Sequence, residues 1–500
     1  MQAVLEEAGT VAVSDLASPG NGDQRPTKKA LSKTNQLFIL KWYNKGVCML
    51  PRDLTVFKRW FSTRKRKPLV LLGARQVGKS TAVRLFAKEM GLKLVEINLE
   101  QFPHLDTVFK SLNVEQILAT IESATGESTQ KPNLLLFLDE VQATPNALAA
   151  LRYLYEQRPE LPIIAAGSLL KFVLSDHEFS MPVGRVEYAW LYPFSFAEFL
   201  RARGKIFLAE TLDAFQPEKF WPEPQHQDLL FELRSYMLVG GMPEVVQGFV
   251  NGSDEKEIQS LQDNIIVTYG DDFSKYASGA ALGRLQQAYR RLPQLCGKKI
   301  KLAEVLPHEK SANVRSVIDL LAKAGIIHRV HHSACDGLPL RASIDFRVFK
   351  VYWLDCGLLN RMQGLTWHVW RQNKKIIYEG QLAEQFVAQE LMSAQKSADP
   401  APLCYWLREG KSANSEVDFV VQRDADLVPV EVKSGAAGSL KSLASFMQYK
   451  KAEYAIKLGA RAPSVQDVSM KLSLADHTVE IRYKLDERPL YLAATIFRDF

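Results

Sequence analysis

Short hydrophobic runs alternate with helix-length amphipathic segments from residue 68 to about residue 200. The runs read PLVLL, KLVEINL, NLLLFLDE and LPIIAAGS, and they are rich in Leu, Val and Ile. Such runs are typical of strands that are buried on both faces of a parallel sheet, because helices cover both sides of that sheet. The pattern therefore predicts an α/β fold with a parallel sheet in this part of the chain.

Helical periodicity replaces the strand pattern after about residue 200. The segments LLFELRSYMLVGGMPEVV and EIQSLQDNIIVTYGDDF favour helices, with breaks at the glycine pair 240–241 and at Pro243. In SANVRSVIDLLAKAGIIHRV, apolar residues recur at helical spacing from residue 314 to residue 321, and the helix stops at Gly325. This arrangement is consistent with the second helix of a helix-turn-helix that leads into a wing.

A second alternation of helices and strands begins at about Ile376. The helix EGQLAEQFVAQELMSAQ precedes the strands LCYWLRE, EVDFVVQ and LVPVEVKS, and the helix SLKSLASFMQYKKA follows them. This order predicts a further α/β domain at the C-terminal end.

The composition is that of an ordinary globular protein. The chain has 500 residues, and 47% of them are hydrophobic. A chain of this length favours about three domains. The 63 basic and 56 acidic residues give a net charge of +7, a weak preference for an acidic partner. Five scattered cysteines predict reduced thiols and a cytoplasmic protein. No stretch approaches the roughly 20 apolar residues of a membrane span, and the polar residues 1–35 predict a disordered tail.

A glycine-rich loop follows the first hydrophobic run. The segment LVLLGARQVGKST has the spacing Gly-x-x-x-x-Gly-Lys-Ser between an apolar strand and an amphipathic helix, which is the context of a phosphate-binding loop. Glycines let backbone N–H groups surround phosphates, lysine offers a point charge, and serine ligates Mg²⁺. The predicted nucleotide-binding residues here are Gly73, Ala74, Arg75, Gln76, Val77, Gly78, Lys79, Ser80 and Thr81.

Two acidic residues end the apolar strand of NLLLFLDEVQ. Asp139, at the tip of this predicted parallel strand, suits Mg²⁺ coordination next to the phosphate loop, together with Ser80. Glu140 is predicted to polarise the attacking water as a catalytic base. The sequence thus predicts a site for ATP and Mg²⁺.

Two further residues are candidates for the same site. Ser168 ends the strand LPIIAAGS, where it would either sense the γ-phosphate or cap the next helix, and the sequence leaves both roles open. Arg185, in MPVGRVEYAW, is a candidate catalytic charge for the transition state.

These segments together resemble prokaryotic P-loop ATPases of the AAA family, AAA-14 type, that carry a C-terminal domain of unknown function, DUF4143. The resemblance rests on LLGARQVGKST, LFLDEVQ, AAGSLL, VGRVEYAWLYPFSFAEFL, LVGGMPEVV, KVYWLDCGLLN, EGQLAEQFVAQEL and EVDFVV…PVEVKSG. It implies an ATPase core (36–205), a helical lid (206–285), a winged-helix-like segment (286–345) and a DUF4143 domain with a restriction-endonuclease-like fold (346–500).

Charged residues interrupt the apolar strands of the C-terminal domain. Side chains alternate faces along a strand, so Glu431 and Lys433 point the same way, roughly 6–7 Å apart. With Asp418 on the preceding strand and Glu384 on the preceding helix, this order resembles the PD-(D/E)xK nuclease constellation. The resemblance implies metal ligands at Glu384, Asp418 and Glu431 and a catalytic role for Asp418, Glu431 and Lys433. The competing interpretation is a charged strand face with a Glu–Lys ion pair.

Two hypotheses for function follow from these residues. The first is an Mg²⁺-dependent ATPase whose nucleotide cycle controls a DNA-directed, nuclease-like C-terminal module. The second is a non-nucleolytic, nucleotide-dependent switch or adaptor that binds a protein partner or assembles as a homo-oligomer. Basic residues in the winged-helix-like segment suit either DNA phosphates or a protein surface: Lys298, Lys299, Lys301, Lys310, Arg315, Lys323 and Arg329.

Overall fold

A computed structural model describes residues 49–168, 170, 184–219, 221–368, 379–395, 401–408, 415–434, 440–473 and 478–498. The disordered tail predicted for residues 1–35 lies outside the described residues.

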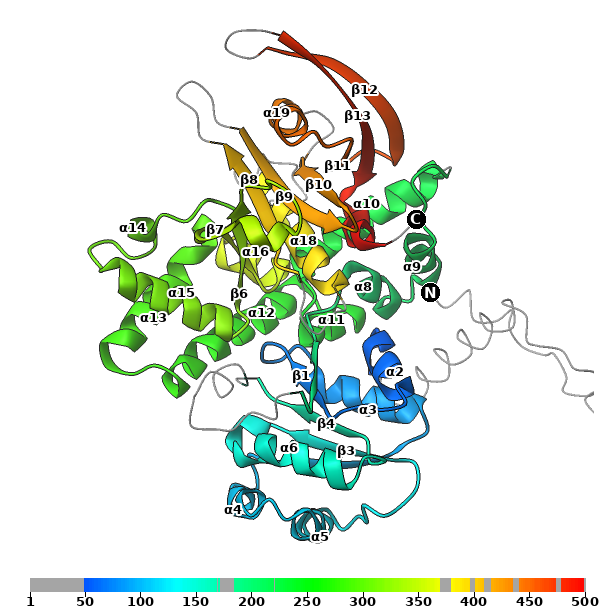
Figure 1. Cartoon of the computed structure of the whole chain (residues 1–500), viewed down its shortest axis with the longest axis vertical. Coiled ribbons are helices and arrows are strands. Elements are labelled where there is room, and N and C mark those ends of the chain that lie inside the picture. The colour runs from blue at the N-terminus through cyan, green and yellow to red at the C-terminus, as the bar shows by residue number, and fades with distance from the viewer. Residues whose placement is uncertain are drawn as a thin grey trace, which may run out of the picture. The chain divides into compact units, whose positions relative to one another are not determined.

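The first sheet is parallel throughout, as the hydrophobic runs predict. Its strands are β1 (Leu69–Leu72), β2 (Lys93–Asn98), β3 (Leu134–Asp139), β4 (Ile163–Ala166) and β5 (Glu187–Trp190), in the order β2-β3-β4-β1-β5 (Figure 1). Strand β5 was not predicted, because it is short and only one of its residues is fully buried. The carboxyl ends of β1, β3 and β4 share one edge, where the phosphate loop and Asp139 lie.

Helices follow the strands of this sheet in the alternating order of an α/β fold. They are α2 (Thr55–Ser62), α3 (Lys79–Glu89), α4 (Leu105–Lys110), α5 (Val114–Thr125), η1 (Val141–Ala143) and α6 (Asn146–Gln157). The apolar stripe of α6, including Leu148, Leu151 and Leu154, joins Leu136 and Leu138 of β3 in one buried core. This packing fixes the strand end that carries Asp139.

A helical region follows. It contains α8 (Phe196–Ala202), α9 (Ile206–Asp213), α10 (Glu223–Val239), α11 (Pro243–Val250), α12 (Glu255–Asp271), η2 (Asp272–Lys275), α13 (Gly279–Arg291), η3 (Leu292–Leu295), α14 (Leu302–Val305) and α15 (Ser311–Lys323). The predicted break between α10 and α11 is confirmed, since Gly240 has a φ of 79° and Pro243 begins α11.

The second sheet is mixed. Its strands are β6 (Ile327–Ser333), β7 (Ile344–Trp353), β8 (Cys404–Arg408), β9 (Ser415–Arg423), β10 (Asp426–Val432), β11 (Tyr454–Gly459), β12 (Ser464–Ser473) and β13 (Thr478–Pro489), in the order β12-β13-β11-β10-β9-β8-β6-β7. Its connections include η4 (Leu340–Ser343), α16 (Cys356–Met362), α18 (Glu379–Ala394) and α19 (Lys441–Lys450), and η5 (Leu490–Phe497) ends the described chain.

Strands β6 and β7 are continuous with the C-terminal sheet. Strand β7 runs across the boundary predicted at residues 345 and 346, and β6 pairs in parallel with β8. The predicted wing therefore does not stand apart from the predicted C-terminal domain, because its strands take part in the same hydrogen-bonded ladder.

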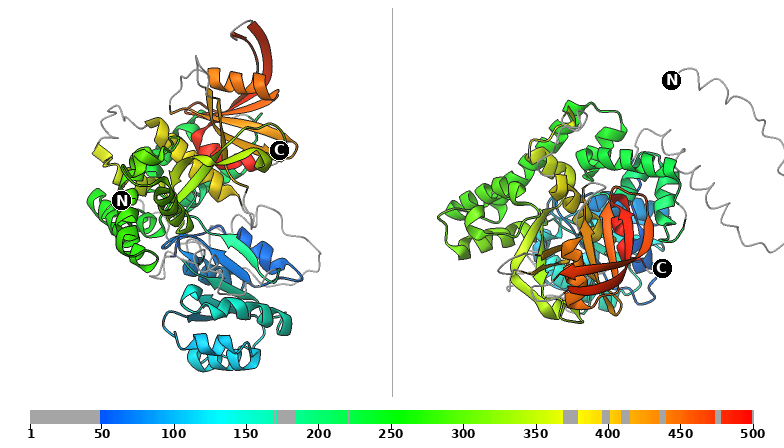
Figure 2. Two further views of the ribbon diagram at one scale, coloured as in Figure 1. Left: turned by 60° about the vertical axis from the view of Figure 1, so that its left-hand side comes forward. Right: turned by 90° about the horizontal axis from the view of Figure 1, so that it is seen from above.

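Helix α19 covers one face of this sheet (Figure 2). Its residues Leu443, Ala444 and Phe446 share a buried core with Val420 of β9 and Leu485 of β13. The predicted order of a helix, three strands and a second helix is confirmed as α18, β8, β9, β10 and α19.

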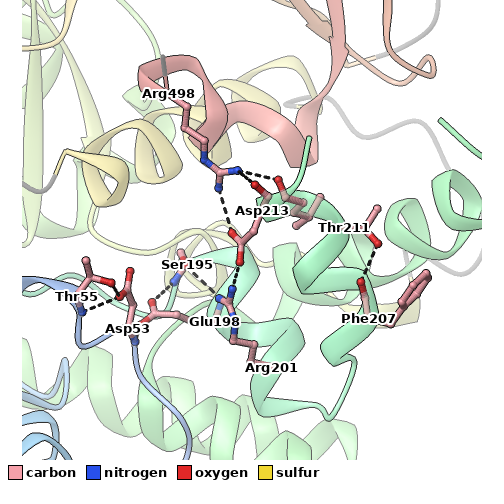
Figure 3. A network of polar contacts seen from close by, with 10 residues as sticks. Asp53, Thr55, Ser195, Glu198, Arg201, Phe207, Thr211, Asp213 and Arg498 are labelled. Carbon is pink, nitrogen blue, oxygen red and sulfur yellow. Dashed lines mark hydrogen bonds and ion pairs between the residues drawn. The ribbon is translucent and has the colours of Figure 1, made fainter. Parts of the chain in front are cut away.

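The C-terminal end of the described chain binds the end of α9 (Figure 3). The guanidinium of Arg498 donates to the carbonyl oxygens of Leu212 at 2.8 Å and Asp213 at 3.0 Å. The carbonyls at the end of a helix lack partners within the helix, so a cation there satisfies them. The nearby carboxylate of Glu198 accepts from the backbone N–H groups of Asp53 and Ser195, both at 2.8 Å.

Candidate nucleotide-binding site and acidic cluster

The phosphate loop, residues 73–80, leaves β1 and enters α3 in the conformation that its glycines permit. Gly73, Gln76 and Gly78 have φ values of 151°, 62° and 87°. A Cβ atom on Gly73 would lie 2.4 Å from the carbonyl oxygen of Leu191, so a larger residue does not fit there. A glycine-rich loop at the N-terminus of a helix presents backbone N–H groups and a positive dipole to an anion.

Lys79 is buried against the loop. Its Nζ donates to the carbonyl oxygens of Gly73 at 3.0 Å and Ala74 at 2.8 Å. Burial lowers the pKa of Lys79 to about 8, although the charges of Glu140 and Asp139 favour the protonated form. The ammonium is therefore held where phosphate oxygens would compete with the carbonyl acceptors.

Ser80 and Asp139 are hydrogen-bonded to each other. The Oγ of Ser80 lies 2.5 Å from Oδ2 of Asp139, and the backbone N–H of Glu140 donates to Oδ1 at 3.0 Å. Burial raises the pKa of Asp139, while the Ser80 hydroxyl partly opposes that effect. A hydroxyl and a carboxylate are hard oxygen ligands, so the two residues fit the Mg²⁺ that the sequence motifs predict.

Glu140 is held by a residue that the sequence did not indicate. The Nε2 of Gln142 donates to Oε2 of Glu140, whose own backbone has a φ of 51°. The Oε1 of Gln142 is buried without a hydrogen-bond partner among the described residues. It lies against the end of β4, because a Cβ atom on Gly167 would come within 2.0 Å of it.

Four predicted residues remain to be placed: Val77, Thr81, Ser168 and Arg185. Val77 and Ser168 are buried, and Ser168 lines a small cavity with Gly73 and Gly325. Thr81 lies in the first turn of α3. Arg185 is exposed, and its Nε lies 2.9 Å from Oε1 of Glu156 on α6. The described contacts of Arg185 do not bring it to the phosphate loop, so its catalytic role stays a prediction.

Residues from the later helices contact the phosphate loop. The Nη1 of Arg75 lies 2.5 Å from Oδ1 of Asp272, and the hydroxyl of Tyr269 donates to the carbonyl oxygen of Arg75 at 2.6 Å. Gly325, after α15, packs on Ala74, with 3.4 Å between an added Cβ atom and that of Ala74. The loop is thus part of a packed junction with α12 and α15.

The predicted C-terminal carboxylates gather around a lysine of β7. The Nζ of Lys350, which is 1% exposed, lies 2.5 Å from Glu416, 3.4 Å from Glu384 and 3.8 Å from Asp418. Asp418 also accepts from the backbone N–H of Val432 at 2.8 Å. We call Lys350, Glu384, Glu416, Asp418, Glu431 and Lys433 the acidic cluster.

The other half of the acidic cluster is an ion pair. The Nζ of Lys433 lies 2.5 Å from Oε1 of Glu431, while Oε2 of Glu431 is buried without a hydrogen-bond partner among the described atoms. Burial raises the pKa of Glu431. Burial also raises the pKa of Asp418 well above its usual range, and the negative charges of Glu384 and Glu431 add to this effect.

The acidic cluster does not fit the metal that its nuclease-like order implies. In the part of the chain that the structure describes, no three His, Cys, Asp or Glu side chains are arranged to hold a metal ion. The ammonium of Lys350 lies among the carboxylates instead. The structure brings Glu384, Asp418, Glu431 and Lys433 into one cluster, whereas the sequence gave no signal for the role of Lys350 in β7.

Family models match the chain in the region of the parallel sheet and in the C-terminal region. Residues 65–200 match the family model of an AAA domain, and residues 379–475 match a domain of unknown function, DUF4143. The first region, which holds the whole parallel sheet and the phosphate loop, is therefore similar to AAA domains. The predicted resemblance to AAA-14 ATPases with DUF4143 is confirmed.

A third match was not predicted. Residues 230–368 match another domain of unknown function, DUF8612, which spans the boundary predicted between the lid and the winged-helix-like segment. None of the curated proteins matches the chain. Among the described helices, none combines the length and the apolar character that crossing a membrane requires.

Proposed function

We propose that the chain binds ATP with Mg²⁺ and hydrolyses the nucleotide. Lys79 and the backbone N–H groups of the loop bind the phosphates. Ser80 and Asp139 would hold Mg²⁺, which when bound neutralises charge on the phosphates. Glu140 orients the attacking water and accepts its proton.

The hydrogen bond between Ser80 and Asp139 carries this proposal. The two residues come from motifs 59 positions apart, and they meet beside Lys79 at the edge of the parallel sheet. Oxygen ligands and one ammonium converge at this edge of the sheet, so the site suits a triphosphate with its metal ion.

Steady-state ATP turnover tests the proposed role of Glu140. Glu140→Gln keeps the size of the side chain but removes the base, so we expect at least a 100-fold loss of turnover with ATP still bound. Glu115→Gln, an exposed change on α5, is the control and should leave turnover unchanged. Normal turnover by Glu140→Gln would remove Glu140 from the mechanism.

We further propose that the nucleotide state controls the C-terminal module through the short segment 241–243. Pro243 packs on the phosphate loop, since a Cβ atom on Gly78 would lie 3.3 Å from its Cγ. The backbone N–H of Gly241 donates to Oδ2 of Asp355 at 2.6 Å, and Gln389 of α18 lies 3.4 Å from the same oxygen. Helix α18 also carries Glu384 of the acidic cluster.

Other buried hydrogen bonds strengthen the same junction. Glu390 of α18 accepts from the backbone N–H of Phe196 at 2.9 Å, and Gln389 donates to the hydroxyl of Tyr236 at 2.8 Å. The segments PFSFAEFL, GGMPEVV, KVYWLDCGLLN and EGQLAEQFVAQEL thus contribute residues to one buried polar junction. A buried network of this kind favours two discrete arrangements over gradual deformation.

Hydrogen exchange tests this control. ATP should change the exchange of residues 379–394 in the wild-type protein and leave it unchanged in Lys79→Ala. Identical exchange with and without ATP, under conditions where ATP is bound, would contradict the control and leave the ATPase proposal intact.

For the C-terminal module we favour the nucleotide-dependent switch or adaptor over the DNA-directed nuclease. The support is the ammonium of Lys350 among the carboxylates. Incubation with plasmid and linear DNA in Mg²⁺ or Mn²⁺ separates the two functions. Nicking by the wild type that is lost in Asp418→Ala would favour the nuclease; no cleavage and no DNA retention would favour a protein partner or a second copy of the chain.

We place the protein in the cytoplasm. The support is that the described cysteines, Cys296, Cys335, Cys356 and Cys404, are buried free thiols.

A further inference from the structure

The ammonium of Lys350 has the position and the partners of a bound cation. Three carboxylates lie within 4 Å of its Nζ, from α18 (Glu384) and from two residues of β9 (Glu416 and Asp418). Its Nζ also lies 5.3 Å from the centre of the Tyr405 ring, a further favourable contact for a cation. The hydroxyl of Tyr352, two residues along the same strand, donates to Oε2 of Glu384 at 2.8 Å.

The surroundings of Lys350 keep it charged. A buried ammonium needs counter-charges, and the carboxylates of Glu384, Glu416 and Asp418, all within 4 Å of the Nζ of Lys350, supply them. The carboxylates depend on the lysine in the same way, because buried carboxylates need a counter-charge. A divalent ion at the same point would face the repulsion of this ammonium.

We propose that Lys350 is a permanent counter-cation that occupies the metal position of the acidic cluster, so that the C-terminal module works without a divalent ion. The lysine is supplied by β7, a strand of the same sheet, and it is hydrogen-bonded to ligands that a metal would otherwise bind. Lys433 is engaged with Glu431, which leaves the proposed metal ligands divided between two ammonium groups.

The inference makes a direct prediction for a variant. Lys350→Met keeps an unbranched apolar side chain but removes the ammonium group, which leaves three carboxylates facing one another. We expect this variant to gain a Mn²⁺ site that the wild-type cluster lacks. The added Asp418→Asn in Lys350→Met/Asp418→Asn removes a ligand and should abolish the gain.

Thermal unfolding and calorimetric titration with Mn²⁺ test the prediction on nucleotide-free, full-length protein. The melting temperature of Lys350→Met should rise by several degrees with Mn²⁺, while that of the wild type and of the double variant should not. Lys457→Met is the matched control. Lys457 is also buried in this sheet, but within the described part of the chain its ion-pair partner is the single carboxylate of Glu487, at 2.8 Å, so its removal should create no Mn²⁺ site.

If Lys350→Met fails to fold, Mn²⁺ binding to the wild type and to Asp418→Asn still tests the proposal. The wild type and Asp418→Asn should bind the same number of Mn²⁺ ions without nucleotide. A site in the wild type that disappears in Asp418→Asn would overturn the proposal, as would a folded Lys350→Met that binds no Mn²⁺. Neither outcome bears on ATP hydrolysis, because the titration contains no nucleotide.

Discussion

The side-chain amide of Gln142 donates a hydrogen bond to the carboxylate of Glu140, and the other end of that amide lies against Gly167 at the end of β4. One side chain thus joins the proposed base to the segment that follows β4 and contains Ser168. We infer that Gln142 is a positioning residue, because its hydrogen bond fixes the direction of the Glu140 carboxylate.

Gln142→Ala should therefore lower the turnover number about tenfold and leave ATP affinity unchanged, since orientation and not binding is lost. In a Glu140→Gln background the same substitution should have no further effect, because both changes act on one interaction. Additive losses measured by steady-state kinetics in the double variant would contradict the positioning role.

Gly167→Ala tests the same relationship from the other side. The new methyl group would lie 2.0 Å from Oε1 of Gln142, so the amide must move and release Glu140. We expect a loss of turnover similar to that of Gln142→Ala. Gly283→Ala is the control, because nothing lies within 4 Å of a Cβ atom added to this glycine of α13, and it should leave turnover unchanged.

The pKa of Lys79 predicts how ATP affinity depends on pH. Below pH 8 the amine is already protonated, so affinity should be nearly constant. As the pH rises through about 8 the free protein loses that proton, and binding must restore it, so affinity should fall by about tenfold per pH unit. Calorimetry in buffers of different ionisation enthalpy should detect proton uptake near pH 8.5, and Lys79→Arg should remove it.

Glu390 predicts a pH dependence of stability. Burial raises the pKa of Glu390 to about 8, although the N–H of Phe196 favours the ionised form. Between pH 4.5 and 8 the folded protein therefore holds a proton that the unfolded chain has lost, and stability should decrease as the pH rises through this window. Glu390→Gln should remove this slope and raise the melting temperature at pH 8 by a few degrees, with little change at pH 5. A decrease at pH 8 would contradict the protonated assignment.

The phosphate loop was predictable because its residues are contiguous and its strand–loop–helix context is local. Asp139 was predictable because it ends a fully apolar run. Lys350 was not, since its partners lie 34 or more positions away and meet only when β7, β9 and α18 pack together. Gln142 gave no signal either, because its role depends on the close approach of β4.

The domain boundaries also depend on contacts between segments that lie far apart in the sequence. Helical spacing correctly predicted α15 and the strand after it, but spacing carries no information on which sheet that strand joins. The pairing of β6 with β8 is a tertiary contact between segments that lie far apart in the sequence.

Equilibrium binding of labelled ATP to purified protein in the presence of Mg²⁺ tests the central claim most directly. We predict that the wild type retains ATP and that Lys79→Ala weakens binding on the order of 100-fold, since a charge-assisted contact to phosphate is lost. Lys88→Ala, an exposed lysine farther along α3, should bind like the wild type. Failure of the wild type to retain ATP, or equal retention by Lys79→Ala, would contradict the account.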